Sequence, residues 1–166
     1  MKRLVLFLLI SWFCQSCEKV EFSMNKSPYW GNDLRLNGYY YNNDESYTDI
    51  IYLYRDGTLA NCAINKQGNV DKIDETLIDF QNDSQFKYRI NWGCFSIGAD
   101  NIQYEYKGTT GCFYFISQFR GIIQNETTFI ISEYKEKNTD KKFKEIFKTY
   151  LFREFSHKPD SSLYKK

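Results

Sequence analysis

DIIYLYRDGTLANCAI, residues 49–64, is the stretch that decides the fold class, because it contains two β-rich runs, 49–54 and 58–64. The tripeptide Arg55-Asp56-Gly57 lies between them, and Asp-Gly between two such runs is the strongest short-range signal of a β-hairpin. A turn of type I′ needs a positive φ at both central residues, which this dipeptide tolerates. The stretch therefore predicts two antiparallel strands that are neighbours in a sheet and are joined by a type I′ turn.

Further strands are predicted on both sides of this hairpin. Each is rich in aromatic or β-branched residues and is bounded by turn formers, and they cover residues 35–42, 86–97, 101–107, 112–125, 128–135 and 147–155. In 86–97 the apolar alternation slips at Gly93-Cys94, which predicts a β-bulge, and Gly121 predicts a bend in 112–125. The last segment also shows helical spacing between Phe143 and Leu151, so a helix is its alternative.

One segment has the pattern of a short amphipathic helix. Its apolar residues recur at spacings of 3, 4 and 3, and its acidic residues stand at the front: Val70, Ile73, Leu77 and Phe80, with Asp71, Asp74 and Glu75. Eight antiparallel strands with short connections can close into a barrel that has no exposed edge, and its interior accommodates side chains or one small ligand. We therefore predict an all-β fold with one short helix, an antiparallel barrel of about eight strands over residues 34–156.

The first 16 residues have the features of a secretory signal peptide. Lys2 and Arg3 supply positive charge, and residues 4–13 form an apolar run that is far shorter than the about 20 residues of a membrane-spanning helix. The Ser16-Cys17 junction resembles the cleavage site of a bacterial lipoprotein, in which the cysteine is acylated and becomes the first residue of the mature chain. We therefore expect 1–16 to be a lipoprotein signal peptide and Cys17 to carry a lipid that anchors the protein to the membrane.

Polar segments flank the predicted barrel on both sides. Residues 17–33 are polar with one proline, which predicts a lipidated tether that lifts the domain off the membrane. Residues 157–166 predict a polar, frayed C-terminal tail.

Composition excludes several classes of function. The 22 basic residues balance 21 acidic ones, so the chain lacks the positive charge of a nucleic-acid-binding protein. The single histidine, His157, lies beside the polar tail. Because the chain has only one histidine, any site that needs two imidazoles is excluded. Acidic residues are scattered, and no spacing favours one pair for hydrolysis. We expect no enzymatic activity, no cofactor, no metal site and no nucleic-acid partner.

Three cysteines lie in the predicted barrel, namely Cys62, Cys94 and Cys112. In an oxidising envelope they would form one disulfide and leave one thiol, with three alternative pairings. The other interpretation is three unbonded cysteines that pack as small apolar side chains. Cys14 and Cys17 have the spacing of a zinc-ligand pair, but they belong to the predicted signal.

Several motifs distributed over the chain are similar to those of a known group of proteins. They are Arg35-Leu36-Asn37-Gly38-Tyr39-Tyr40-Tyr41, Trp92-Gly93-Cys94-Phe95-Ser96-Ile97, Gly121-Ile122-Ile123 followed by Thr127-Thr128-Phe129, and Lys158-Pro159-Asp160-Ser161. Over nearly its whole mature length the chain thus resembles small uncharacterised lipoproteins of the Bacteroidota. The resemblance implies a lipocalin-like barrel that is anchored through its lipid to the outer membrane, on either the periplasmic or the outer side. The motifs are structural and imply no chemistry.

Two functions fit such a barrel. The first is a non-enzymatic binding module for a small apolar or amphipathic ligand, in a pocket at one barrel mouth lined by Tyr39, Trp92 and Tyr104. The second is a filled, rigid scaffold that contacts or inhibits envelope or host proteins. Glycines in three of the strands either open room in the interior or only permit bending: Gly38, Gly93 and Gly121. The state of the interior distinguishes the two functions.

Overall fold

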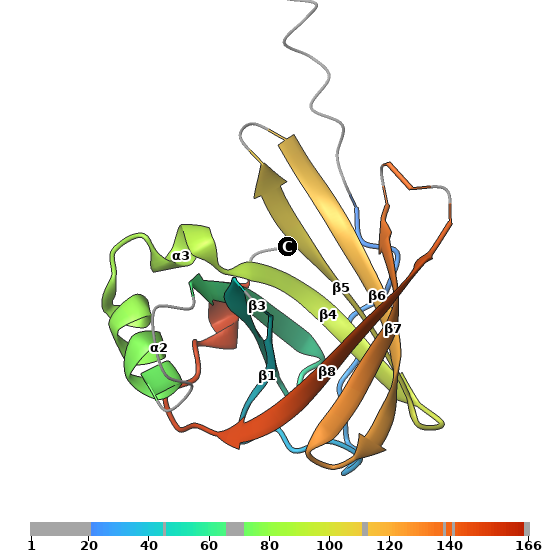
Figure 1. Cartoon of the computed structure of the whole chain (residues 1–166), viewed down its shortest axis with the longest axis horizontal. Coiled ribbons are helices and arrows are strands. Elements are labelled where there is room, and N and C mark those ends of the chain that lie inside the picture. Colours follow the sequence, from blue (N-terminus) through green and yellow to red (C-terminus); the bar gives the residue numbers. More distant parts are fainter. Residues whose placement is uncertain are drawn as a thin grey trace, which may run out of the picture.

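The computed structural model describes residues 21–44, 46–65, 72–110, 113–137, 139–140 and 142–164. Within them eight antiparallel strands form a closed barrel, in which each strand pairs with its neighbours along the chain and the last pairs with the first (Figure 1). The strands are β1 (Gly38–Asn43), β2 (Tyr47–Leu53), β3 (Thr58–Asn65), β4 (Asn91–Gly98), β5 (Asn101–Thr110), β6 (Phe113–Asn125), β7 (Thr128–Glu136) and β8 (Lys144–Glu154). The segment between β3 and β4 contains α2 (Ile73–Asn82) and the single turn α3 (Phe86–Arg89), and the 3₁₀ turn η2 (Ser161–Leu163) follows β8. The predicted signal peptide and Cys17 lie outside the described residues.

The predicted barrel is confirmed. Every predicted strand region contains a strand, and the predicted short helix is α2. The last segment is a strand rather than a helix, because β8 pairs with both β7 and β1 and so closes the barrel. The first part of the predicted strand 86–97 is wrong, since residues 86–89 form α3 and β4 begins only at Asn91. In this helical turn the ring of Phe86 packs against the ring of Phe80 of α2, with 5.2 Å between the two ring centroids.

The turns differ in type from the prediction. The β2–β3 hairpin is confirmed, but its turn is not of type I′, because only Gly57 of the three loop residues has a positive φ, +83°. The N–H of Gly57 donates to the carbonyl oxygen of Tyr54 at 3.0 Å, as in a three-residue hairpin loop that ends on a left-handed glycine. Two consecutive positive φ angles occur instead between β4 and β5, at Ala99 (47°) and Asp100 (64°).

The predicted β-bulge at Gly93-Cys94 is wrong, because β4 pairs with both of its neighbours through this point in continuous register. Glycine is needed at position 93 for another reason: a Cβ there would collide with the carbonyl oxygen of Glu105 on β5. A Cβ at Gly38 or Gly121 would collide with the backbone of a neighbouring strand in the same way. The predicted bend at Gly121 coincides with a shift in the register between β6 and β7 at Arg120/Gly121. These glycines therefore permit close approach of strands and do not open room in the interior.

The two faces of the sheet carry two separate apolar clusters. The inner cluster lies inside the barrel, and its largest buried members are Tyr40, Phe95, Tyr104, Phe129 and Tyr150. The outer cluster lies between β1–β3 and the covering helix α2, and includes Tyr39, Ile50, Tyr52, Ile73 and Leu77 (Figure 1). Consecutive apolar residues on β1 and β2 are buried for this reason, since both faces of these strands are covered.

One end of the barrel is closed by residues 29–36, which cross it before β1 begins. This end carries the β2–β3, β4–β5 and β6–β7 turns. Leu34 is buried there, and the ring of Tyr29 packs against Phe95 of the inner cluster at 5.9 Å. We call it the closed end. At the opposite, open end the β5–β6 and β7–β8 hairpins extend beyond the other strands (Figure 1).

The C-terminal tail is packed on the barrel and is not frayed over its described part. The Lys158 ammonium donates to the carbonyl oxygens of Leu36 and Leu53 at 2.8 and 2.7 Å. Tyr54 donates its hydroxyl to the carbonyl oxygen of Pro159 at 2.7 Å. Burial lowers the pKa of Lys158 to about 8. The tail therefore belongs to the folded domain, although its composition is polar.

Candidate functional site

Four aromatic rings line the inside of the barrel from its packed middle toward the open end. Tyr104 lies opposite Phe119, and Phe119 lies opposite Tyr134, so these side chains share the inner face of β5, β6 and β7. Phe119 stacks on Tyr104 and Tyr106 with centroid distances of 4.7 and 5.4 Å, and its ring is 5.1 Å from that of Tyr134. Tyr104 is buried, whereas the other three are only half-buried. We call these four residues the aromatic wall, and solvent reaches three of its rings.

Polar side chains from β2, β3 and β8 face the same interior. The Asp49 carboxylate accepts one hydrogen bond from the Tyr150 hydroxyl and one from the Asn61 amide, both at 2.6 Å. The Lys148 ammonium donates to the Tyr47 hydroxyl at 3.1 Å. We call these five residues the polar cluster. Asp49 and Lys148 are half-buried, so the cluster is also within reach of solvent.

Burial and charge set the protonation of this cluster. Burial is the main influence on the Asp49 carboxyl and raises its pKa, although the hydrogen bonds from Tyr150 and Asn61 favour the ionised form. Burial alone would lower the pKa of Lys148, but its hydrogen bond to Tyr47 and the nearby Asp49 carboxylate outweigh burial and raise that pKa. Lys148 is therefore a cation at neutral pH, and it lies near a carboxyl group that holds its proton more strongly than usual.

The interior thus offers two kinds of surface. The aromatic wall presents flat apolar faces, on which an apolar body can stack. The polar cluster presents a cationic donor in Lys148 and, in Asp49, a carboxyl that accepts or donates according to its protonation. This arrangement is suited to binding a molecule with an apolar body and a polar head.

The structure separates the three residues that the sequence predicts to line one pocket. Tyr104 faces the interior and belongs to the aromatic wall. Tyr39 belongs to the outer cluster, where its hydroxyl donates to Asp74 of α2 at 2.7 Å. Trp92 lies on the same outer side, with its ring 6.3 Å from that of Tyr164 in the tail. Only Tyr104 therefore lies at the candidate site described here.

Sequence reasoning missed Asp49 and Lys148. Asp49 stands in the same phase of β2 as Ile51 and Leu53, which belong to the inner cluster. A charged residue in an inward phase was the available signal. Lys148 stands in the same phase of β8 as Tyr150, but the helical alternative for that segment hid its phase.

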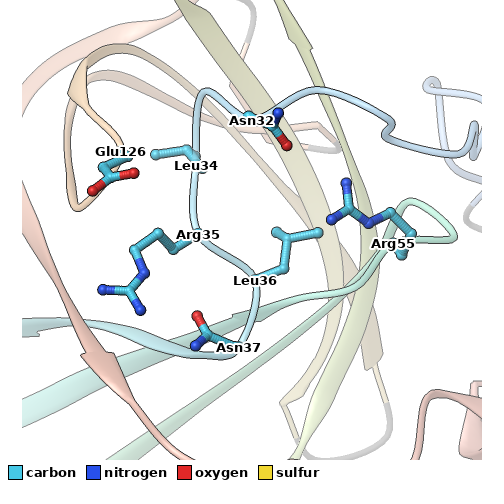
Figure 2. A pocket seen from close by; sticks show the side chains of 7 residues that line it. All are labelled: Asn32, Leu34, Arg35, Leu36, Asn37, Arg55 and Glu126. Carbon is cyan, nitrogen blue, oxygen red and sulfur yellow. The ribbon is translucent and has the colours of Figure 1, made fainter.

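A hollow of about 710 Å³ lies at the closed end (Figure 2). Arg35 and Arg55 line it, and Figure 2 shows the Arg55 guanidinium pointing toward the closing segment and the Arg35 side chain pointing away from Arg55. Arg55 donates to the carbonyl oxygens of Tyr29 and Gly31, at 3.2 and 3.1 Å. Arg35 lies 4.7 Å over the ring of Phe152. Both arginines thus hold the closing segment in place and do not converge on a common ligand position.

Cys62 and Cys94 are unbonded and buried, and Cys112 lies outside the described residues. Burial raises the pKa of both thiols, that of Cys94 to about 12, so they remain protonated and unreactive at neutral pH. His157 is exposed. Over the described ranges, the His, Cys, Asp and Glu side chains form no group of three or more that could hold a metal ion. In that same part of the chain, every helix is too short or too polar to cross a membrane.

The architecture is an eight-stranded antiparallel closed barrel in the described part of the chain, which is consistent with a lipocalin-like fold. Comparison with protein-family models, with curated proteins and with solved structures finds no match to this chain.

Proposed function

We propose that this protein is a lipoprotein of the cell envelope, anchored to the outer membrane through a lipid on Cys17, whose barrel binds one small amphipathic ligand. The ligand enters from the open end and contacts the solvent-accessible parts of the aromatic wall and the polar cluster. The observation that carries the proposal is the partial exposure of inward-facing Tyr106, Phe119 and Lys148 toward the open end, while the interior toward the closed end is packed.

The chemistry of the interior defines the ligand class. The apolar surface of the ligand that stacks on Tyr106 and Phe119 is removed from water. This burial is the main source of affinity in such sites. The Lys148 ammonium favours an acceptor group on the ligand, such as a carboxylate or a carbonyl oxygen. Fatty acids and aryl carboxylates combine both features. A ligand without a polar head would leave the cation of Lys148 partly desolvated and would bind less tightly.

Calorimetric titration with dodecanoate tests this assignment. The protein from Glu18 onward contains every described residue and serves as the soluble form. We expect dodecanoate to bind, and Lys148→Met, which keeps the apolar stem, to weaken binding by about tenfold, or about 1.4 kcal/mol. Lys135→Met removes a lysine from the outer face of β7 and should leave binding unchanged. If neither dodecanoate nor dodecanol binds to the folded protein, the barrel is a filled scaffold for protein contacts instead.

Metabolic labelling with palmitate tests the anchor separately. The full chain should incorporate label and partition with the membrane, and Cys17→Ser should abolish both. Cys14→Ser is the matched control, because Cys14 follows the bulky Phe13 and is the poorer acceptor. If Cys17→Ser retains the label and Cys14→Ser loses it, the acceptor is Cys14.

A further inference from the structure

The first described residues of the chain are held firmly against the outside of the barrel. Glu105 of β5 is fully buried there, and its carboxylate accepts hydrogen bonds from the Ser23 hydroxyl at 2.8 Å and the Met24 N–H at 2.6 Å. Gln118 of β6 donates to the same carboxylate at 3.0 Å. Two of these hydrogen bonds to the buried carboxylate come from the segment and fix it on the barrel, although the polar composition of residues 17–33 predicts a tether.

The direction of the segment follows from its contacts. The Lys137 ammonium, just past the open-end terminus of β7, donates to the carbonyl oxygen of Glu21 at 2.5 Å. Lys26 pairs with Asp56 of the β2–β3 turn at 2.8 Å, and that turn belongs to the closed end. The segment therefore runs from the open end toward the closed end, and Figure 1 shows it beginning near the open-end terminus of β7. The lipid anchor, four residues before Glu21, is thus attached on the open-end side.

The length of chain in between limits where the membrane can lie. A fully extended residue spans at most about 3.6 Å, so Cys17 lies within about 14 Å of Glu21. That distance is too short for the anchor to reach the closed end, because β6 alone has 13 residues, or about 40 Å of strand. An acyl chain on Cys17 therefore brings the open end close to the bilayer.

The rim of the open end carries exposed aromatic side chains. Phe113 and Tyr114 begin β6, next to the β5–β6 connection, and their exposed fractions are 78% and 50%. Phe147, on the outer side of β8 near its open-end terminus, is 78% exposed. The Lys107 ammonium lies 3.9 Å over the ring of Tyr114. Aromatic rings with neighbouring lysines are typical of surfaces that sit at the level of lipid headgroups.

We propose that the open rim docks on the lipid bilayer, with Phe113, Tyr114 and Phe147 in the headgroup region. This inference rests on the proposed anchor at Cys17. It gives the candidate site a direction: the aromatic wall and the polar cluster open toward the membrane, so the barrel takes its amphipathic ligand from the bilayer or delivers it there. The closed end, with the exposed Trp30, points away from the lipid.

Depth-dependent quenching by brominated lipids tests this orientation. The full acylated protein is reconstituted in vesicles of phosphatidylethanolamine and phosphatidylglycerol, with and without brominated acyl chains. Two proteins are compared: one with Phe113→Trp in a Trp30→Phe background, and the wild type, which carries the native Trp30. Trp92 is present in both proteins and supplies a common background. We expect brominated lipids to quench the Trp at position 113 by about half, because it sits at headgroup depth, and to leave Trp30 unquenched. Phe147→Trp, as a second rim reporter, should behave like Phe113→Trp.

Flotation of the vesicles separates the possible failures. If the protein does not float with the vesicles and carries no acyl chain, the proposed anchor fails. If the acylated protein floats but position 113 is not quenched, the docking inference is overturned while the anchor stands. Quenching of Trp30 in place of position 113 would reverse the orientation and overturn the inference as well. So would a rim that remains unquenched in vesicles but crosslinks to a protein in the native envelope, since the rim would then be a protein-binding surface.

Discussion

Removal of the Tyr150 hydroxyl should destabilise the protein in a pH-dependent way. Tyr150 is 1% exposed, and its hydroxyl donates to Asp49 at 2.6 Å. Tyr150→Phe keeps the ring, which stacks on Phe129 at 4.9 Å, so packing changes little. A hydrogen bond to an ionised group contributes about 1.5–3 kcal/mol, against about 1 kcal/mol for a neutral pair. The loss therefore depends on whether Asp49 is ionised.

The direction of this pH dependence follows from the raised pKa of Asp49. Because its pKa is higher in the folded than in the unfolded state, the stability it contributes is fully present below about pH 4 and is lost as the pH rises through the native pKa. The Tyr150 hydroxyl favours the ionised form and so limits this loss. Without it, we expect the free energy of unfolding to fall by about 1.5–3 kcal/mol at pH 8 and by about 1 kcal/mol at pH 4.

Urea denaturation of the soluble form, followed by tryptophan fluorescence at the two pH values, measures the difference. Tyr114→Phe is the matched control, because Tyr114 is 50% exposed and its change should stay within about 0.5 kcal/mol. Equal losses at pH 8 and pH 4 would refute the role assigned to the Asp49 charge. No loss at either pH would show that the hydrogen bond is not formed in solution.

Three further predictions concern the core. Gly93→Ala should cost about 3 kcal/mol in urea denaturation, because its Cβ meets a strand backbone, whereas Gly98→Ala, with open space around the Cβ, should cost under about 0.5 kcal/mol. Asp49→Asn should flatten the dependence of the unfolding free energy on pH above pH 4. If the variant and the wild type show the same dependence in urea denaturation, the role assigned to Asp49 is wrong. Native protein should leave Cys62 and Cys94 unmodified by iodoacetamide at pH 8, as judged by peptide mass spectrometry, until urea unfolds it. Rapid labelling of either thiol in the folded protein would contradict their burial.

Local signals were sufficient for the strands and less so for the connections. Asp56-Gly57 located the β2–β3 hairpin because glycine tolerates a positive φ, but the turn type depends on how many loop residues the twist of the strands accommodates. The slip of alternation at Gly93-Cys94 was interpreted as a bulge. In the structure the alternation is continuous: Ile90 and Trp92 pack in the outer cluster, whereas Phe95 packs in the inner one, so apolar residues occur in both phases of the segment.

By itself the sequence determined where strands and the short helix α2 form in the described part of the chain, because β-rich runs and turn formers act on their near neighbours. Only the tertiary structure decided which way the aromatic residues face. Tyr39 and Tyr40 are adjacent, and alternation alone does not say which one enters the barrel, since α2 buries the outer face as completely as closure buries the inner one. The candidate site was beyond local reasoning for the same reason. Asp49 and Tyr150 are 101 positions apart, and they meet only because β8 pairs with β1 and closes the barrel.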